Sequence, residues 1–197
     1  MKNILFTLFF ISLSNSLLSQ NSKKIIYLNT DNIEITKKQY NTAHKKTTFN
    51  VETENDTVII KKLYSRKNFV KLDSIYLNQI KGFLTKVSGA EFDKNKNTII
   101  HLYRENNNIR KDIKYKKYWN YIKKHSNKYQ SFLIGSKESG IKQDIKHHIY
   151  LDEKDFLNYL FFENSIFEIN HLFIKPNGET FIFFGVDDIL MVLDWSV

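Results

Sequence analysis

Hydrophobic residues recur along the chain with two spacings, and each spacing predicts a different kind of element. Alternating or short continuous apolar runs predict strands, which we place at residues 23–28, 47–53, 57–64, 97–104, 129–136, 166–174 and 180–185. Apolar residues three and four positions apart predict helices, which we place at residues 36–45 and 73–88 and after Asp112, Asp152 and Asp187. Residues 105–108 are all polar and are expected to form a loop. The mixture predicts an α/β protein.

Polar residues at the ends of these segments support several of them. Thr36 with Gln39 three residues later has the pattern of a capping box, which marks the start of a helix. Asp73 is a preferred N-cap residue before the next helix. The segment Lys175-Pro176-Asn177-Gly178-Glu179 predicts a type I turn followed by a glycine bulge, so the two strands around it form a hairpin.

The first 19 residues have the three-part pattern of a secretory signal peptide. A positive start at Lys2 precedes an apolar run over residues 4–13 and a small, polar stretch over residues 14–22. The apolar run is shorter than the ~20 residues that a membrane-spanning helix needs. Cleavage after Ser16 or after Ser19 agrees with the pattern, and the alternative is a buried N-terminal helix. We therefore expect an exported protein, periplasmic or secreted, without a stable membrane span.

The second half of the chain resembles the thioredoxin fold. From residue 97 the order is strand, helix, strand, helix, two hairpin strands and a helix, and the hairpin reads as two apolar strands around a Gly-containing turn over Leu172–Phe183. The resemblance implies a thioredoxin-like domain over residues 93–197, after a small α+β extension over residues 20–92. It also implies that strands 98–104, 130–135, 168–174 and 180–185 share one sheet, with the last pair antiparallel.

The residues that carry thioredoxin chemistry are absent. The 197 residues include no cysteine and one proline, Pro176. The family's Cys-x-x-Cys corresponds here to Asn106-Asn107-Asn108-Ile109, and its cis-proline corresponds to a position near Ile169. Thiol–disulfide exchange needs a thiolate, so this activity is excluded. The lack of cysteine also excludes disulfides, Cys-ligated zinc and iron–sulfur clusters.

The net charge of +9 is unevenly distributed along the chain. Residues 23–146 hold 27 Lys and Arg against 12 Asp and Glu, whereas residues 147–197 hold 2 against 9. Most of the basic residues are lysines. Dedicated binding sites for phosphate or carboxylate often use arginine instead, because its guanidinium can make two parallel hydrogen bonds. The lysine-rich balance is typical of a solvated surface with a diffuse positive potential.

A basic and aromatic segment between Arg110 and Lys128 is the main candidate for binding. Basic and aromatic side chains together can bind an acidic macromolecule by charge and stacking. The candidate binding residues are Lys114, Lys116, Lys117, Tyr121, Lys123 and Lys124. Because Tyr115, Tyr118, Trp119 and Ile122 fall on one helical face, the alternative is a helix that buries this face and exposes its lysines to water.

Histidines are the candidate catalytic groups. His101 and His171 lie in predicted strands and could act as general bases if a partner lay within hydrogen-bonding distance; the alternative is a structural role. His147-His148 has Asp144 nearby but no third ligand and no HExxH spacing. We therefore expect no metal site and no cofactor. The acidic pairs Asp152-Glu153 and Asp187-Asp188 precede predicted helices, where capping explains them.

These features favour a non-enzymatic binding or interaction module built on a redox-inactive thioredoxin-like fold. Its expected partner is an acidic macromolecule or another exported protein. The rival hypothesis is a secreted hydrolase or nuclease that uses the strand histidines with carboxylates. The sequence indicates no oligomeric state.

Overall fold

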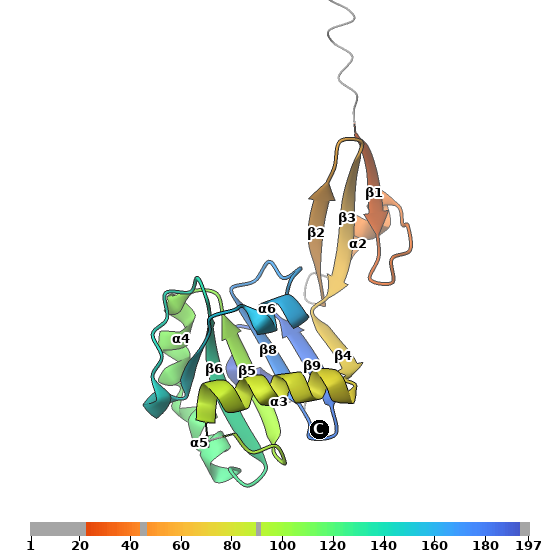
Figure 1. The fold of residues 1–197 in the computed structure, drawn as a ribbon. Helices are drawn as coiled ribbons and strands as arrows, with labels where there is room; N and C mark the ends of the chain where they lie inside the picture. The colour runs from red at the N-terminus through yellow and green to blue at the C-terminus, as the bar shows by residue number, and fades with distance from the viewer. Residues whose placement is uncertain (1–22, 44–46, 90–91, 194–197) are drawn as a thin grey trace, which may run out of the picture. The chain divides into compact units, whose positions relative to one another are not determined.

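The computed structural model describes residues 23–43, 47–89 and 92–193, which belong to two compact units (Figure 1). Of the described residues, the smaller unit contains 23–43 and 50–63, and the larger contains 47–49, 64–89 and 92–193. The protein is a mixed α/β structure with two sheets and, in the described ranges, five α-helices. None of the helices in these ranges has the length and apolar character needed to cross a membrane. The predicted signal peptide lies outside the described residues.

The smaller sheet has the strand order β1-β3-β2. Its strands are β1 (Lys24–Leu28), β2 (Thr48–Glu54) and β3 (Val58–Ser65), with β1 parallel to β3. The capping box is confirmed, because the Gln39 amide donates to Thr36 Oγ1 at 3.2 Å and the Thr36 amide donates to Gln39 Oε1 at 2.8 Å. The helix that follows, α2, covers Lys37–Thr42.

The larger unit is built on a six-stranded sheet with the order β4-β9-β8-β5-β6-β7. The strands are β4 (Lys67–Lys71), β5 (Asn97–Tyr103), β6 (Tyr129–Ser136), β7 (Ile149–Asp152), β8 (Ile169–Ile174) and β9 (Glu179–Phe184). Strands β5, β6 and β7 are parallel, whereas β8 is antiparallel to β5 and to β9, and β4 is antiparallel to β9. The prediction that β5, β6, β8 and β9 share one sheet, with the last pair antiparallel, is confirmed. The short strands β4 and β7 were not predicted.

Helices cover both faces of this sheet (Figure 1). One face packs against α4 (Asn106–Ile113), α5 (Lys116–Lys124) and the 3₁₀-helix η3 (Ile189–Val192), and Ile99, Tyr118, Phe173 and Val192 are buried in this layer. The other face is covered by α3 (Ser74–Ser88) and α6 (Phe156–Phe161). A second 3₁₀-helix, η2 (Ile145–His147), precedes β7. The burial of these apolar side chains is the main favourable term in folding.

The structure corrects the prediction at the start of α4. Residues 106–108, expected in a polar loop, form its first turn, and Asp112 lies in its last turn rather than before the next helix. The next helix, α5, begins at Lys116. Asparagine is a weak helix former, but Ile109 is buried against the sheet, and this packing outweighs the local preference.

The larger unit begins earlier in the chain than residue 93, where the resemblance places the start of the second domain. Strand β4 pairs with β9, and α3 buries Ile80 and Leu84, so residues 64–89 belong to the larger unit. The predicted N-cap of α3 is confirmed, because the Tyr76 amide donates to the Asp73 carboxylate at 2.9 Å. The five residues of β4 do not indicate from sequence which strand they pair with.

Candidate ligand-binding site

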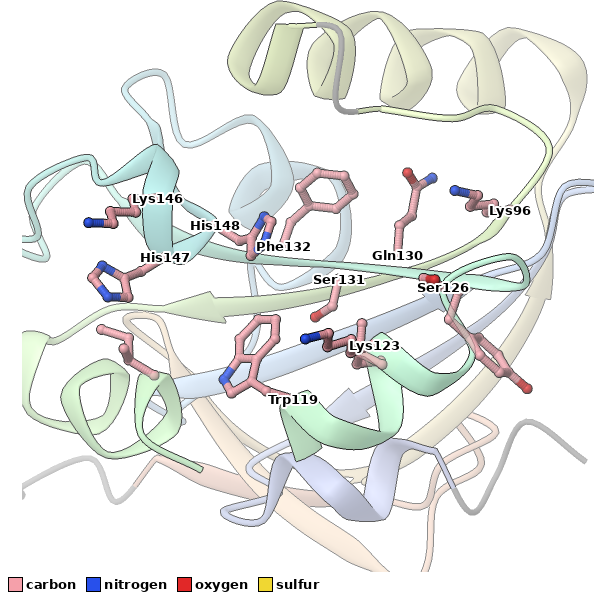
Figure 2. Close-up of a pocket in the computed structure, with 13 residues that line it drawn as sticks. Lys96, Trp119, Lys123, Ser126, Gln130, Ser131, Phe132, Lys146, His147 and His148 are labelled. Atoms are coloured by element: carbon pink, nitrogen blue, oxygen red, sulfur yellow. The ribbon is translucent and has the colours of Figure 1, made fainter. Parts of the chain in front are cut away.

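A pocket with a volume of about 660 Å³ lies beside β6, where its neighbour β7 stops (Figure 2). Strand β7 pairs with Leu133–Ser136 only, so residues 129–132 of β6 have no strand on their outer side. The pocket lining contains no acidic residue. Its basic members are Lys96, Lys123, Lys146, His147 and His148. A concave site of this size with a few polar groups is typical of ligand binding.

The main chain of Ser131 faces the outer edge of β6. Polar main-chain groups alternate between the two sides of a parallel strand. The amide of Asn97 on β5 donates to the Lys128 carbonyl at 3.0 Å, and the amide of Leu133 donates to the His148 carbonyl on the opposite side at 3.0 Å. By this alternation the N–H and C=O of Ser131 point away from β5, and neither has a hydrogen-bond partner among the described residues. Ser131 is 6% exposed, so this edge is recessed in the pocket.

Aromatic and aliphatic side chains form the walls of the pocket. Figure 2 shows Trp119 and Lys123 of α5 on the same side of β6 as Ser131, and Phe132 on the other side. The Trp119 indole donates through Nε1 to the Asp112 carbonyl at 2.9 Å. It also stacks on the His148 ring, with centroids 5.7 Å apart and planes at 20°. These two contacts fix the indole, so the wall that it forms is already in place without a ligand.

Two of the lysines at the pocket keep their charge uncompensated. Lys96 lies 3.7 Å from an Asp93 oxygen, and His147 Nδ1 lies 2.7 Å from Asp144 Oδ2. The hydrogen bond from His147 lowers the pKa of the Asp144 carboxyl. Neither Lys123 nor Lys146 has an ion-pair partner in the part of the chain that the structure describes. The pocket therefore has a positive potential that favours an anionic ligand.

The basic segment predicted from sequence contributes only in part to this pocket. Helix α5 buries Tyr118 and Ile122, as the helical spacing predicts. Of the predicted binding residues, Lys123 lines the pocket. The exposed lysines outside it are Lys114, Lys116, Lys117 and Lys124. Tyr121 is half-buried, with its ring centroid 4.3 Å from that of His125 and 6.0 Å from that of Tyr129.

Behind the pocket, a chain of buried hydrogen bonds joins four side chains. Ser131 Oγ lies 2.7 Å from the Tyr118 hydroxyl, which lies 2.7 Å from His101 Nε2. His101 Nδ1 lies 2.8 Å from His171 Nδ1, and His171 Nε2 lies 2.7 Å from the Val186 carbonyl. The sequence predicted both histidines as candidate catalytic residues, and the structure brings them together on one face of the sheet.

Only one direction of donation satisfies this chain with both imidazoles neutral. The Val186 carbonyl can only accept, so His171 carries its proton on Nε2 and accepts at Nδ1. His101 then donates from Nδ1 and accepts at Nε2 from the Tyr118 hydroxyl, which accepts from Ser131. Burial lowers the pKa of His101 well below its usual value, with the neighbouring His171 as a second cause. Burial also lowers the pKa of His171 to about 4, against the opposing effect of the Val186 carbonyl.

Asp112, which the sequence pattern places just before a helix, is a buried carboxylate. It is 1% exposed, and its Oδ2 accepts a hydrogen bond from the Tyr103 hydroxyl at 2.9 Å. Its Oδ1 is buried without a hydrogen-bond partner in the described residues. Burial raises the pKa of this carboxyl to about 6, and the Tyr103 hydrogen bond opposes the rise. A single acidic residue between lysines gives no sequence signal for this environment.

Asp152 and Asp188 have local structural roles at helix starts. Asp152 accepts from the amides of Phe156 and Leu157 in the first turn of α6, at 2.9 and 2.7 Å, although the N-cap residue is Asp155. Asp188 accepts from the Leu190 amide at 2.9 Å and starts η3. Within residues 23–43, 47–89 and 92–193, no group of three potential metal ligands lies close together.

Comparison of the chain with protein-family models, with curated proteins and with solved structures finds no match. The function of the site therefore has to be inferred from its own geometry. The larger unit contains a basic, aromatic pocket beside β6 and a buried hydrogen-bond chain behind it.

Proposed function

We propose that the larger unit is a non-enzymatic binding module that holds an anionic group of its partner in the pocket beside β6. The observation that carries this proposal is a preformed pocket whose lining contains five basic residues and no acidic one. Its partner is an acidic macromolecule or another exported protein. Apolar walls bury the uncharged part of such a ligand, and the few polar groups orient it.

The distribution of charge around the pocket supports this role. Lys123 and Lys146 offer ammonium groups with no ion-pair partner in the described ranges, so a bound anion would not have to displace a protein carboxylate. The exposed lysines of α5 extend the positive potential beyond the pocket. Such a surface increases the rate at which an anionic partner arrives, and this effect weakens as salt increases.

The rival function, a hydrolase or nuclease that uses the histidines, has less support from the geometry. His101 and His171 are both 0% exposed, and each of their ring nitrogens already has a partner inside the protein. A general base works best when its pKa lies near the working pH, whereas burial lowers the pKa of both histidines. Burial also raises the pKa of Tyr118, which separates Ser131 from His101. Transfer of a proton along this route would be unfavourable.

Charge reversal in the pocket tests the proposed function. The variant with Lys123→Glu and Lys146→Glu is expected to lose most of the salt-sensitive retention of the wild type on an anionic column. The control, Lys37→Glu with Lys38→Glu, makes the same change in net charge on the exposed surface of α2. Equal loss of retention in both variants would show that net charge, not the pocket, governs binding, and would overturn the proposal.

A substrate screen separates the two functions. Wild-type protein is expected to be inactive against phosphodiester, ester, peptide and glycoside substrates. Hydrolysis that disappears in the His101→Ala variant, with the variant still folded by circular dichroism, would favour the rival function.

The arrangement of the larger sheet supports a redox-inactive thioredoxin-like fold, which we propose for this unit. Support comes from the order β6-β5-β8-β9, with β5 and β6 parallel and the last two strands as an antiparallel hairpin. Helices α4 and α5 connect the first two of these strands, and α6 lies between β7 and β8 on the opposite face. An experimental structure in which these four strands have another order would contradict this proposal.

We also propose that residues 1–19 direct export of the chain. The support is the sequence pattern of a charged start, an apolar run and small polar residues. N-terminal sequencing of protein recovered from the periplasm or medium of a Gram-negative host is expected to begin at Leu17 or Gln20. Recovery of the intact chain from the cytoplasm alone would contradict export.

A further inference from the structure

The recessed edge of β6 points to a more specific ligand for the pocket. We infer that the pocket binds an extended, acidic peptide segment of the partner, whose main chain pairs with the N–H and C=O of Ser131. This inference rests on the proposed function and specifies the chemistry of the partner. It adds a main-chain contact to the charge contacts already described.

The edge is available because β7 stops short of it. His148 donates its amide to the Ile145 carbonyl and has a left-handed φ of 55°, so the chain turns away from β6 at this point. On the other side of this turn, the His148 carbonyl accepts from Leu133, the next outward-facing residue of β6 after Ser131. A peptide strand beside Ser131 would therefore continue the line of β7 along the same edge. Addition of a strand to an open edge is a common mode of peptide recognition.

An extended peptide satisfies this edge better than other anions do. Each peptide residue offers both a donor and an acceptor, which match the N–H and C=O that Ser131 presents on one side. A phosphate group could contact the lysines and accept from the Ser131 N–H, but an ionised phosphate has no donor for the Ser131 C=O. The edge is also recessed, with Ser131 only 6% exposed, so a slim extended chain reaches it and a duplex does not.

Acidic side chains are favoured because basic residues lie along the whole edge. Figure 2 shows Lys146 and His147 toward the β7 end of the segment and Lys96 toward the other end. Side chains of an extended peptide alternate between its two faces. Those on one face would meet Trp119 and Lys123, and those on the other would meet Phe132 and Lys96. A segment that mixes acidic and apolar residues therefore fits both the charges and the walls.

The experiment uses a fluorescent, blocked peptide of three Asp-Val repeats and a second peptide that is N-methylated at every residue. The two peptides have equal charge and the same side chains, but the second has no N–H donors. Fluorescence anisotropy is expected to show at least tenfold weaker binding of the methylated peptide, because loss of one or two buried hydrogen bonds has about this effect. All binding measurements use the full-length protein.

Hydrogen exchange provides a residue-level test in the same protein. The unmodified peptide is expected to slow exchange of the Ser131 amide about tenfold or more by covering it. The Phe132 amide, which faces β5 and is already paired, serves as the internal control and is expected to change little. An unchanged Ser131 amide at saturating peptide would overturn main-chain pairing.

The outcomes separate this inference from the proposed function. Equal binding of both peptides, lost in the variant with Lys123→Glu and Lys146→Glu, would support the anion pocket and overturn the pairing with Ser131. No peptide binding, with retention on the anionic column still dependent on Lys123 and Lys146, would overturn the peptide as partner. If neither peptide binds, and retention on the anionic column does not depend on Lys123 and Lys146, the pocket is overturned as the binding site.

Discussion

His101 on β5 lies directly opposite His171 on β8, and their Nδ1 atoms are 2.8 Å apart. Two charged imidazolium rings at this distance would repel each other, and burial disfavours a charge on either ring, so the folded protein favours the neutral pair. The hydrogen-bond chain that contains the pair connects β5, β6 and β8 with α5 and the segment before η3. Its protonation state is therefore linked to the stability of the whole larger unit.

Acidification is expected to destabilise the protein between pH 6.5 and about pH 4. The folded pKa values of His101 and His171 are lowered, that of His171 to about 4, so the unfolded chain binds more protons in this range. Stability from these groups is complete above pH 6.5 and falls as pH decreases, by up to about 1.4 kcal/mol per pH unit for each histidine. Urea unfolding at several pH values measures the slope.

The control for this prediction is the double variant His101→Leu with His171→Leu, which has no group to titrate in this site. Its slope between pH 6.5 and pH 4.5 is expected to be lower by close to two protons. The same slope in the variant and the wild type would show that other groups cause the acid sensitivity.

The contribution of Asp112 to stability is expected to have the opposite pH dependence to that of the histidines, and replacement by asparagine should remove it. The pKa of Asp112 in the folded protein is about 6, above the usual value of 3.8. The folded protein therefore loses stability as pH rises through this range and the buried carboxyl ionises. The Asp112→Asn variant should be more stable than wild type at pH 7.5, by up to about 3 kcal/mol, and little different at pH 4. A variant that is less stable at pH 7.5 would contradict this account.

Removal of the Tyr118 hydroxyl is expected to destabilise the larger unit by about 1–3 kcal/mol. The Tyr118→Phe variant keeps the ring but leaves Ser131 Oγ and His101 Nε2 without the hydroxyl that connects them. The matched control is Tyr159→Phe, because Tyr159 is 75% exposed and should change stability by less than about 0.5 kcal/mol. Thermal or urea unfolding of both variants gives the comparison, and equal effects would refute the importance of the chain.

Substitution of Gly178 by alanine is expected to weaken the β8–β9 hairpin by about 1–3 kcal/mol. Gly178 has a φ of +88°, and a Cβ there would lie 2.9 Å from the Leu72 carbonyl oxygen. Gly82 in α3 is the control, because a Cβ there meets nothing within 4 Å. The Gly82→Ala variant should gain about 0.5–1 kcal/mol, since alanine is the better helix former. A loss of stability in Gly82→Ala, or none in Gly178→Ala, would contradict these assignments.

Local signals in the sequence predicted much of the fold. The capping box at Thr36, the N-cap at Asp73 and the hairpin around Gly178 depend on a few neighbouring residues, and the structure contains all three. The alternation of apolar residues also predicted the four central strands. The start of α4 was missed because its asparagines favour a loop locally, whereas contacts of Ile109 with the sheet decide the structure.

The candidate site was less predictable because it depends on pairing between distant strands. The proximity of His101 and His171 requires the register of β5 against β8, which are about 70 residues apart in sequence. The pocket arises where β7 ends, and β7 has only four residues. Ser131 has no distinguishing sequence context. Lys123 was predicted for its charge, but its neighbours in the pocket come from other segments.

The histidine pair also selects one alignment of β8 on β5 from several that apolar packing alone would allow. A shift of β8 by two residues keeps every side chain on its face of the sheet. It would, however, place His101 opposite Ile169 or Phe173 instead of His171. Each ring would then bury a nitrogen with no partner, at a cost of about 1–3 kcal/mol per group. A polar contact in the centre of an apolar layer thus discriminates against misaligned folded states.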